Sequence, residues 1–243
     1  MLTGKKVVVV GGSSGIGLAP AELAKAQGAE VVIASRNAER VAAAAKKIGA
    51  TGIAADVTND ESVVALFKQC GPVDHVVVTA AQLRTGPFKT VAMEDVRATM
   101  EGKFWGPWRV ARAAEIRAGG SLTLVSGFLN IRPRPNSAIV GAANGAIESL
   151  TRALALELAP RGILANAIAP GFVNTPMSVK ADGVNELETE WFRDNYVRYD
   201  HLPLKRAATP EEVAGVAWFL AGPDASYMTG SVVTVDGGLT ITF

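Results

Sequence analysis

The stretch Val10-Gly11-Gly12-Ser13-Ser14-Gly15-Ile16-Gly17 decides the fold because of what lies on either side of it. The β-branched run Val7–Val10 predicts a strand before it, and the apolar spacing of Ile16–Gln27 predicts an amphipathic helix after it. Glycines permit the tight turn that this connection needs, and the free N–H groups at a helix start attract a pyrophosphate. An ordinary tight turn is the alternative, but the strand-turn-helix context favours a dinucleotide-binding loop.

Further along the chain, short strand-like runs alternate with longer, Ala-rich amphipathic stretches. The predicted strands are Val7–Val10, Val31–Ala34, Gly52–Ala55, His75–Thr79, Leu122–Val125, Leu164–Ala169 and Val232–Val235. The predicted helices are Ile16–Gln27, Ala38–Ile48, Glu61–Lys68, Met93–Ala118, Ser137–Leu158 and Pro210–Leu220. This alternation predicts an α/β Rossmann fold, with a doubly wound, mainly parallel, seven-stranded sheet and helices on both faces.

We expect a single domain over residues 1–243, because a hydrophobic content of 49% suffices for one sheet buried between two layers of helices. The segment Phe172–Ala208 has no strong periodicity. Irregular segments of this length in compact domains are often functional, and we interpret this one as a substrate lid.

The charged residues nearly balance, with 24 Lys and Arg against 23 Asp and Glu. No global field therefore favours nucleic acid or an anionic membrane, and a small-molecule partner is expected. Cys70 is the single cysteine, which excludes an internal disulfide framework and fits a reducing compartment. With no signal-like segment and no long apolar run in the sequence, we expect a cytoplasmic protein. No metal site is expected.

Taken together, several motifs resemble those of the short-chain dehydrogenase/reductase family. Val10–Gly17 is similar to its TGxxxGIG signature, with Val10 in place of the threonine. Asp56-Val57 resembles the pair that contacts adenine, Asn166–Gly171 the NxxxPG strand end, and Thr175-Pro176-Met177 the nicotinamide-side loop. Gly230 and Val235–Gly238 resemble the C-terminal interface strand. The resemblance covers nearly the whole chain and implies NAD(P) along the strand ends, in a homotetramer or homodimer.

The resemblance also implies which residues contact the cofactor. They are Gly11, Ser13, Ser14, Gly15, Ile16, Gly17, Ser35, Arg36, Asn37, Asp56, Val57, Thr79, Ala80, Ala81, Asn144, Pro170, Gly171, Val173 and Thr175.

The end of the second predicted strand indicates which nucleotide is bound. NAD-binding folds usually place Asp or Glu there, whereas a 2′-phosphate requires a cation and hydroxyl donors. Ser35 and Arg36 supply those groups, and Ala34 is not acidic. The sequence therefore favours NADP(H), with a solvated loop charge as the alternative role for Arg36.

The family's catalytic pattern is interrupted. Its YxxxK motif aligns with Val140 and Asn144, its serine with Gly127, and its asparagine with Lys103. Ser126 directly precedes the serine position, and no tyrosine lies between Met1 and Phe192. Because valine can neither protonate nor stabilise the alkoxide that forms in carbonyl reduction, a tyrosine general acid is excluded on this alignment.

One compensation is visible, since lysine and asparagine have exchanged positions relative to the family. We interpret Lys103 and Asn144, with Ser126, as the candidate catalytic residues. Pro107 lacks the N–H that would bond the carbonyl of Lys103, so we expect a bend in the helix there. Alternatively, Lys103 extends to solvent and the bend belongs to the fold.

Other polar residues are weaker candidates. Arg132 and Arg134 follow the fifth predicted strand and could bind an acidic substrate, whereas His75 suits a structural role in its strand. The predicted lid carries Trp191, Phe192, Tyr196, Tyr199 and His201, which could supply an acid or serve in packing.

The sequence favours an atypical NADP(H)-dependent oxidoreductase acting on a small hydrophobic carbonyl or conjugated alkene. Conjugate reduction needs only enolate stabilisation, which a lysine or water can give without tyrosine. One alternative is a catalytically silent NADP(H)-binding sensor or scaffold. Another is a non-redox lyase, isomerase or cyclase on the same fold.

Overall fold

The computed structural model describes residues 2–180 and 182–242. Within these residues seven strands form one parallel sheet in the order β3-β2-β1-β4-β5-β6-β7. The strands are β1 (Lys6–Val10), β2 (Glu30–Ser35), β3 (Thr51–Ala54), β4 (Val73–Val78), β5 (Ile116–Val125), β6 (Leu164–Pro170) and β7 (Val232–Val235). The predicted doubly wound Rossmann sheet is confirmed.

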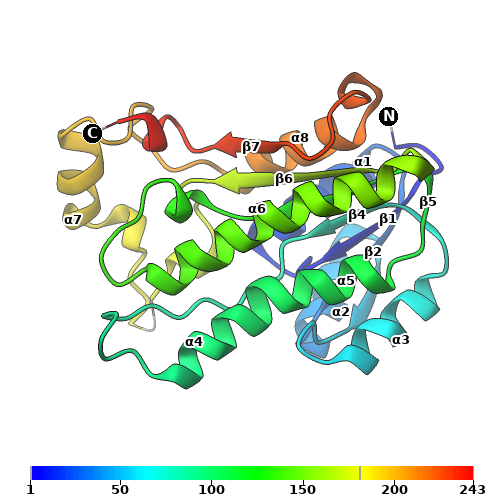
Figure 1. Cartoon of the computed structure of the whole chain (residues 1–243), viewed down its shortest axis with the longest axis horizontal. Coiled ribbons are helices and arrows are strands. Elements are labelled where there is room, and N and C mark those ends of the chain that lie inside the picture. Colours follow the sequence, from blue (N-terminus) through cyan, green and yellow to red (C-terminus); the bar gives the residue numbers. More distant parts are fainter. Residues whose placement is uncertain (1, 181, 243) are drawn as a thin grey trace.

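Helices cover both faces of the sheet (Figure 1). They are α1 (Gly15–Ala26), α2 (Ala38–Ile48), α3 (Asp60–Cys70), α4 (Met93–Met100), α5 (Gly106–Ala113), α6 (Ala138–Leu158), α7 (Glu190–Phe192) and α8 (Pro210–Ala221). Alternate residues of β1 face opposite ways: Val8 and Val10 pack with residues of α3, α5 and α6, whereas Val7 and Val9 pack with residues of α1, α2 and α8. This alternation gives the sheet two apolar cores.

Strands β1 and β4 lie side by side at the centre of the strand order. From β1 the chain continues to β2 and β3 on one side, and from β4 it continues to β5, β6 and β7 on the other side. The strand order therefore reverses between β1 and β4. In open α/β sheets, ligands bind in the crevice outside the carboxyl ends of the strands at such a point. The fold therefore places the glycine-rich loop after β1, the segment after β4 and the turn after β5 around one crevice.

The predicted helix Met93–Ala118 is wrong at its C-terminal end. The helical chain stops at Ala113, and β5 begins at Ile116, which pairs with Val73 of β4. Sheet pairing overrides the helical tendency of this Ala-rich stretch.

The same helical chain contains a π-helix over Glu101–Trp105, directly before α5. The N–H of Gly106 bonds to the carbonyl of Glu101, five residues earlier. Pro107 lies in the first turn of α5, so the expected irregularity around Pro107 takes the form of a π-turn between α4 and α5.

The predicted lid segment contains short helical turns at Pro176–Ser178, Glu186–Glu188 and α7, followed by a π-helix at Arg193–Arg198. Figure 1 shows α7 beyond the carboxyl ends of β6 and β7, beside the C-terminus. Phe192 and Leu202 are buried in a small separate core with Leu239, against which Phe172 and Tyr196 pack. Among the described residues, no helix is long and apolar enough to cross a membrane.

Candidate active site

Two cavities lie in the crevice at the carboxyl ends of the strands. One is lined by the ends of β2 and β3 with the segment after β4, and the other by the ends of β5 and β6 with the predicted lid. Thr79, Ala81 and Met177 line both, so the two cavities adjoin. A dinucleotide has the extended shape that such a pair of cavities would accept, with one end in each.

The glycine-rich loop packs tightly between β1 and the segment after β4. A Cβ added to Gly17 would lie 2.1 Å from the carbonyl oxygen of Gly11, and one added to Gly11 would lie 2.5 Å from the backbone nitrogen of Ala80. Gly11 also has a φ of 92°, which favours glycine. The loop therefore requires glycine at both positions to start α1 beneath the crevice.

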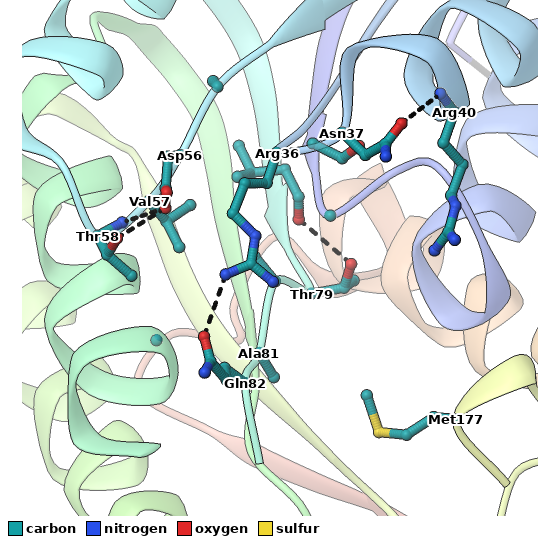
Figure 2. A pocket seen from close by; sticks show the side chains of 16 residues that line it. Arg36, Asn37, Arg40, Asp56, Val57, Thr58, Thr79, Ala81, Gln82 and Met177 are labelled. Atoms are coloured by element: carbon teal, nitrogen blue, oxygen red, sulfur yellow. Dashed lines mark hydrogen bonds between the residues drawn. The ribbon is translucent and has the colours of Figure 1, made fainter. Parts of the chain in front are cut away.

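The first cavity carries two arginines and one acidic residue (Figure 2). Arg36 Nη1 donates to Gln82 Oε1 at 3.1 Å, and Arg40 lines the same cavity. Asp56 Oδ1 instead accepts from the backbone N–H and the hydroxyl of Thr58, at 2.9 and 2.8 Å. Two guanidinium groups against one carboxylate leave this end of the crevice net positive, which makes it attractive to an anion.

Two buried side-chain oxygens in the crevice have no hydrogen-bond partner among the described residues. Ser35 Oγ is in the first cavity and Asn144 Oδ1 is in the second. Such atoms are costly unless a ligand or water satisfies them. Their positions, one at each end, fit a ligand that carries polar groups at both ends, as NADP(H) does.

Lys103 projects from the π-helix toward the end of β5. Its ammonium donates to the carbonyl oxygens of Val125 and Ser126, at 2.9 and 2.7 Å, and the side chain is only 5% exposed. Burial lowers the pKa of Lys103 to about 8, because an apolar environment disfavours the charged form. The structure therefore places Lys103 inside the second cavity and not in solvent, which removes the alternative of an exposed side chain.

Asn144 and Val140 lie one turn apart on α6 and line the same cavity as Lys103. A Cβ added to Gly127, at the end of β5, would lie 3.0 Å from Asn144 Nδ2. The structure thus brings Lys103, Asn144 and Gly127 together around the end of β5. Val140 presents only hydrocarbon to the cavity.

Ser126 is also buried in this wall, but its hydroxyl is engaged elsewhere. It lies 3.3 Å from Glu148 Oε1 and 3.3 Å from the carbonyl oxygen of Ile168, which share its one proton as acceptors. Glu148 on α6 is itself 8% exposed. The backbone carbonyl of Ser126, as an acceptor for Lys103, contributes more directly to the site than its hydroxyl does.

The mouth of the second cavity is formed by apolar residues and one ion pair. Arg134 lies 3.6 Å from Glu186 of the predicted lid, and both line the cavity. Arg132 instead bonds backbone carbonyls of His201 and Leu239 and the hydroxyl of Thr242, so it joins the lid base to the C-terminal segment.

The aromatic candidates Tyr196 and Tyr199 of the lid, and His75 in the sheet, lie in environments that do not indicate a catalytic role. Tyr196 packs edge-on against Phe172, whereas Tyr199 is mostly exposed. His75 Nδ1 lies 2.9 Å from Ser121 Oγ within the sheet, and burial lowers the pKa of His75 to about 4. This environment suits a neutral structural histidine.

The structure brings most of the predicted site residues to the crevice. The following line one cavity or both: Gly11, Ile16, Ser35, Arg36, Asn37, Asp56, Val57, Thr79, Ala80, Ala81, Lys103, Ser126, Asn144, Pro170, Gly171, Val173 and Thr175. Ser13, Ser14, Gly15 and Gly17 line neither; they form the loop and the start of α1, where Gly15 packs against Thr175.

Sequence reasoning missed several cavity residues, notably Arg40, Gln82 and Leu83. Arg40 could have been found from its spacing of four after Arg36, which puts it in the first turn of α2. Gln82 directly follows the segment after β4, but its pairing with Arg36 joins residues 46 positions apart, so no local pattern indicates it.

Comparisons with known proteins agree with this architecture. A family model described as enoyl-(acyl carrier protein) reductase matches residues 10–240. A galactitol 2-dehydrogenase (L-tagatose-forming) from Cereibacter sphaeroides is 36% identical, over 99% of this chain and 96% of its own. A peroxisomal 2,4-dienoyl-CoA reductase from Danio rerio is 31% identical, over 100% of this chain and 83% of its own.

Among solved structures, a blue fluorescent protein from a metagenomic library, in complex with NADPH, superposes with a TM-score of 0.89. It is 30% identical, and the match covers 98% of each chain. The order of the strands, the glycine-rich loop and these matches along the whole chain lead to one conclusion: the chain belongs to the short-chain dehydrogenase/reductase family of oxidoreductases, which use nicotinamide cofactors.

Proposed function

We propose that this chain is an atypical NADP(H)-dependent oxidoreductase that acts on a small hydrophobic carbonyl or conjugated alkene. The observation that carries the proposal is the buried ammonium of Lys103, held at the end of β5 in the cavity that Asn144 also lines. Lysine and asparagine thus occupy one site, with their positions exchanged relative to the family pattern.

The cofactor preference is supported by the first cavity. Arg36 and Arg40 provide positive charge there, and Ser35 Oγ is a buried hydroxyl that has no hydrogen-bond partner among the described residues. A 2′-phosphate would satisfy all three groups. The related blue fluorescent protein was solved with NADPH. When bound, NADP(H) supplies or accepts the hydride, and Asn144 Oδ1 would accept from a hydroxyl of its nicotinamide ribose.

Lys103 is proposed to hold the proton that the reaction needs. Its ammonium has three donors, and the two carbonyls take two, which leaves one for an oxygen of the substrate. With the pKa lowered to about 8, the group is mostly protonated at neutral pH yet gives up its proton more readily than an ordinary lysine. Charge that develops on a substrate oxygen would be stabilised by this cation in a cavity of low polarity.

The substrate class is supported by the apolar cavity wall. Leu83, Phe128, Leu129, Phe172 and Leu187 supply large apolar side chains to a cavity that polar residues such as Lys103 and Asn144 also line. Two comparisons concern acyl compounds with a conjugated alkene, the enoyl reductase model and the dienoyl-CoA reductase. The galactitol dehydrogenase acts on a polyol, which an apolar wall suits less well.

The test is a screen of carbonyls, enones and imines with NADPH, followed by Lys103→Met on any substrate found. Methionine keeps most of the stem packing and removes the charge, so turnover should fall about a hundredfold or more while NADPH binding survives. Lys68→Met, an exposed lysine on α3, is the matched control and should retain parental turnover. Parental turnover in Lys103→Met would refute the role of Lys103, and NADPH binding with no turnover across the screen would favour the silent protein.

A further inference from the structure

Gln82 Oε1 accepts a hydrogen bond from the guanidinium of Arg36, at 3.1 Å, on an exposed part of the first cavity wall. Figure 2 shows the two side chains meeting from different strands, Arg36 after β2 and Gln82 in the segment after β4. Arg40 extends from α2 on the same side of the cavity as Arg36 (Figure 2).

Gln82 is held firmly from behind by the π-helix that carries Lys103. A Cβ added to Gly102 would lie 2.9 Å from the Cβ of Gln82 and 3.0 Å from its backbone nitrogen. Only a glycine at position 102 allows so close an approach. The backbone and Cβ of Gln82 therefore rest on the backbone of Gly102, and from this anchored stem its amide oxygen offers Arg36 an acceptor.

An acceptor with an anchored stem orients the flexible side chain of Arg36 before a ligand arrives. The arginine side chain then loses less conformational entropy when the ligand binds. Because an amide is neutral, it takes one of the five N–H donors of Arg36 and leaves the positive charge uncompensated. A carboxylate in the same place would pair with the charge and repel a phosphate. The affinity of this cavity for an anion therefore depends on residue 82 as well as on the two arginines.

We propose that Gln82 is a specificity-determining residue, which pre-orients Arg36 toward a 2′-phosphate without neutralising it. The inference rests on the proposed use of NADP(H) and names a residue that sets how strongly NADP(H) is preferred over NAD(H). It predicts that the single change Gln82→Glu shifts the preference toward NAD(H).

The test is calorimetric titration of NADPH and NADH into the parent, Gln82→Glu and Gln82→Ala. Gln82→Glu should weaken NADPH binding about tenfold or more and change NADH binding less than about threefold, since one charged hydrogen bond is lost or opposed. Gln82→Ala should weaken NADPH binding by about three- to tenfold. Gln69→Glu adds the same charge on the exposed surface of α3 and should leave the ratio of the two affinities unchanged.

The outcomes separate the inference from the proposal on which it rests. If the parent binds NADPH and NADH equally, the NADP(H) preference itself is wrong. If the parent prefers NADPH and Arg36→Ala removes that preference, but Gln82→Glu retains it, only the role of Gln82 is overturned. Equal losses for both cofactors in both Gln82 variants, with unchanged circular dichroism, would likewise overturn it and make Gln82 a general structural contact.

Discussion

Lys103 is buried, and its lowered pKa should be measurable as a dependence of the free energy of unfolding on pH. Its native pKa is about 8, against 10.5 for an unperturbed lysine. Below pH 8 both the folded and the unfolded chain hold the proton, so this residue contributes no pH dependence. Between pH 8 and about 10.5 the unfolded chain holds more protons, so the free energy of unfolding rises with pH.

We expect this rise to reach about 1.4 kcal/mol per pH unit. Urea unfolding of the parent and of Lys103→Met at pH 7, 8, 9 and 10 measures this rise. The difference between the two free energies of unfolding isolates the contribution of Lys103, because the other titrating groups are common to both proteins. The parent should gain stability relative to the variant above pH 8. A constant difference from pH 7 to pH 10 would mean that the pKa of Lys103 is not lowered.

Gly127 explains why the family's serine cannot simply be restored at the end of β5. Its φ of 154° and ψ of 165° lie in a region that essentially only glycine adopts, and an added Cβ would approach Asn144 Nδ2. Gly127→Ala should therefore lower the free energy of unfolding by about 1 to 3 kcal/mol. Gly215→Ala, in the open middle of α8, should instead raise it by about 0.5 to 1 kcal/mol. Urea denaturation compares them, and equal effects would contradict the strained backbone at Gly127.

At the scale of elements, the predicted lid divides into an anchored part and an outer part. The anchored part holds Phe192 and Leu202, which are almost fully buried. The outer part, which includes Glu186–Glu188, is only partly buried and meets the rest of the site through Leu187, which packs against the core of the anchored part, and through the ion pair of Glu186 with Arg134, at 3.6 Å. An ion pair between two partly exposed side chains at this distance contributes little to stability. The outer part can therefore rearrange around a ligand at a low cost in free energy.

We expect the peptides with Pro176–Ser178 and Glu186–Glu188 to gain hydrogen-exchange protection when NADPH and a substrate analogue bind. The peptide with Phe192 should change little, because its side chain is already packed. The peptide that covers α8, a helix none of whose residues lines either cavity, is the internal control. Unchanged exchange in the outer part would identify the segment as a packed insertion and not a lid.

The elements themselves followed from local patterns in most of the chain. Helix α2 and strand β7 have the predicted bounds, because each is a regular amphipathic or β-branched run between turn residues. The error at Ala118 arose where an Ala-rich stretch enters β5, whose first residue is fixed by pairing with Val73. The π-helix was indicated only indirectly by Pro107, since the i to i+5 bond at Gly106 has no sequence signature of its own.

The site was predictable where family motifs exist and not where contacts are long-range. The glycine-rich loop, Arg36 and Asn144 were found from motif and position. The acceptors of Lys103 are backbone carbonyls of Val125 and Ser126, which no side-chain pattern reveals. Gln82 became visible only in the structure, where the segment after β4 reaches past the end of β1 to the Arg36 side chain that follows β2.

At the scale of the whole molecule, two neighbouring tryptophans leave an apolar surface uncovered in the single chain. Trp105 and Trp108 are each exposed by more than two fifths, and their rings lie 6.0 Å apart. They face a groove beside Val64 of α3, and Figure 1 shows α3 and α5 as neighbours on the same side of the sheet. Exposed aromatic groups of this kind are typical of protein interfaces.

We expect this groove, lined by Val63, Val64, Trp105, Trp108 and Ala113 together with the charged residues Asp60, Arg109 and Arg112, to be covered by a second copy of the chain in the predicted homodimer or homotetramer. Burying the exposed part of each tryptophan, on the order of 100 Å², would contribute about 2.5 kcal/mol per ring. Light scattering at micromolar concentration should show an oligomer that Trp105→Lys with Trp108→Lys dissociates. Trp191→Lys, equally exposed but on α7, should leave the oligomer intact. A monomeric parent would refute the predicted oligomer, and an oligomer that survives the double substitution would place the interface on another face.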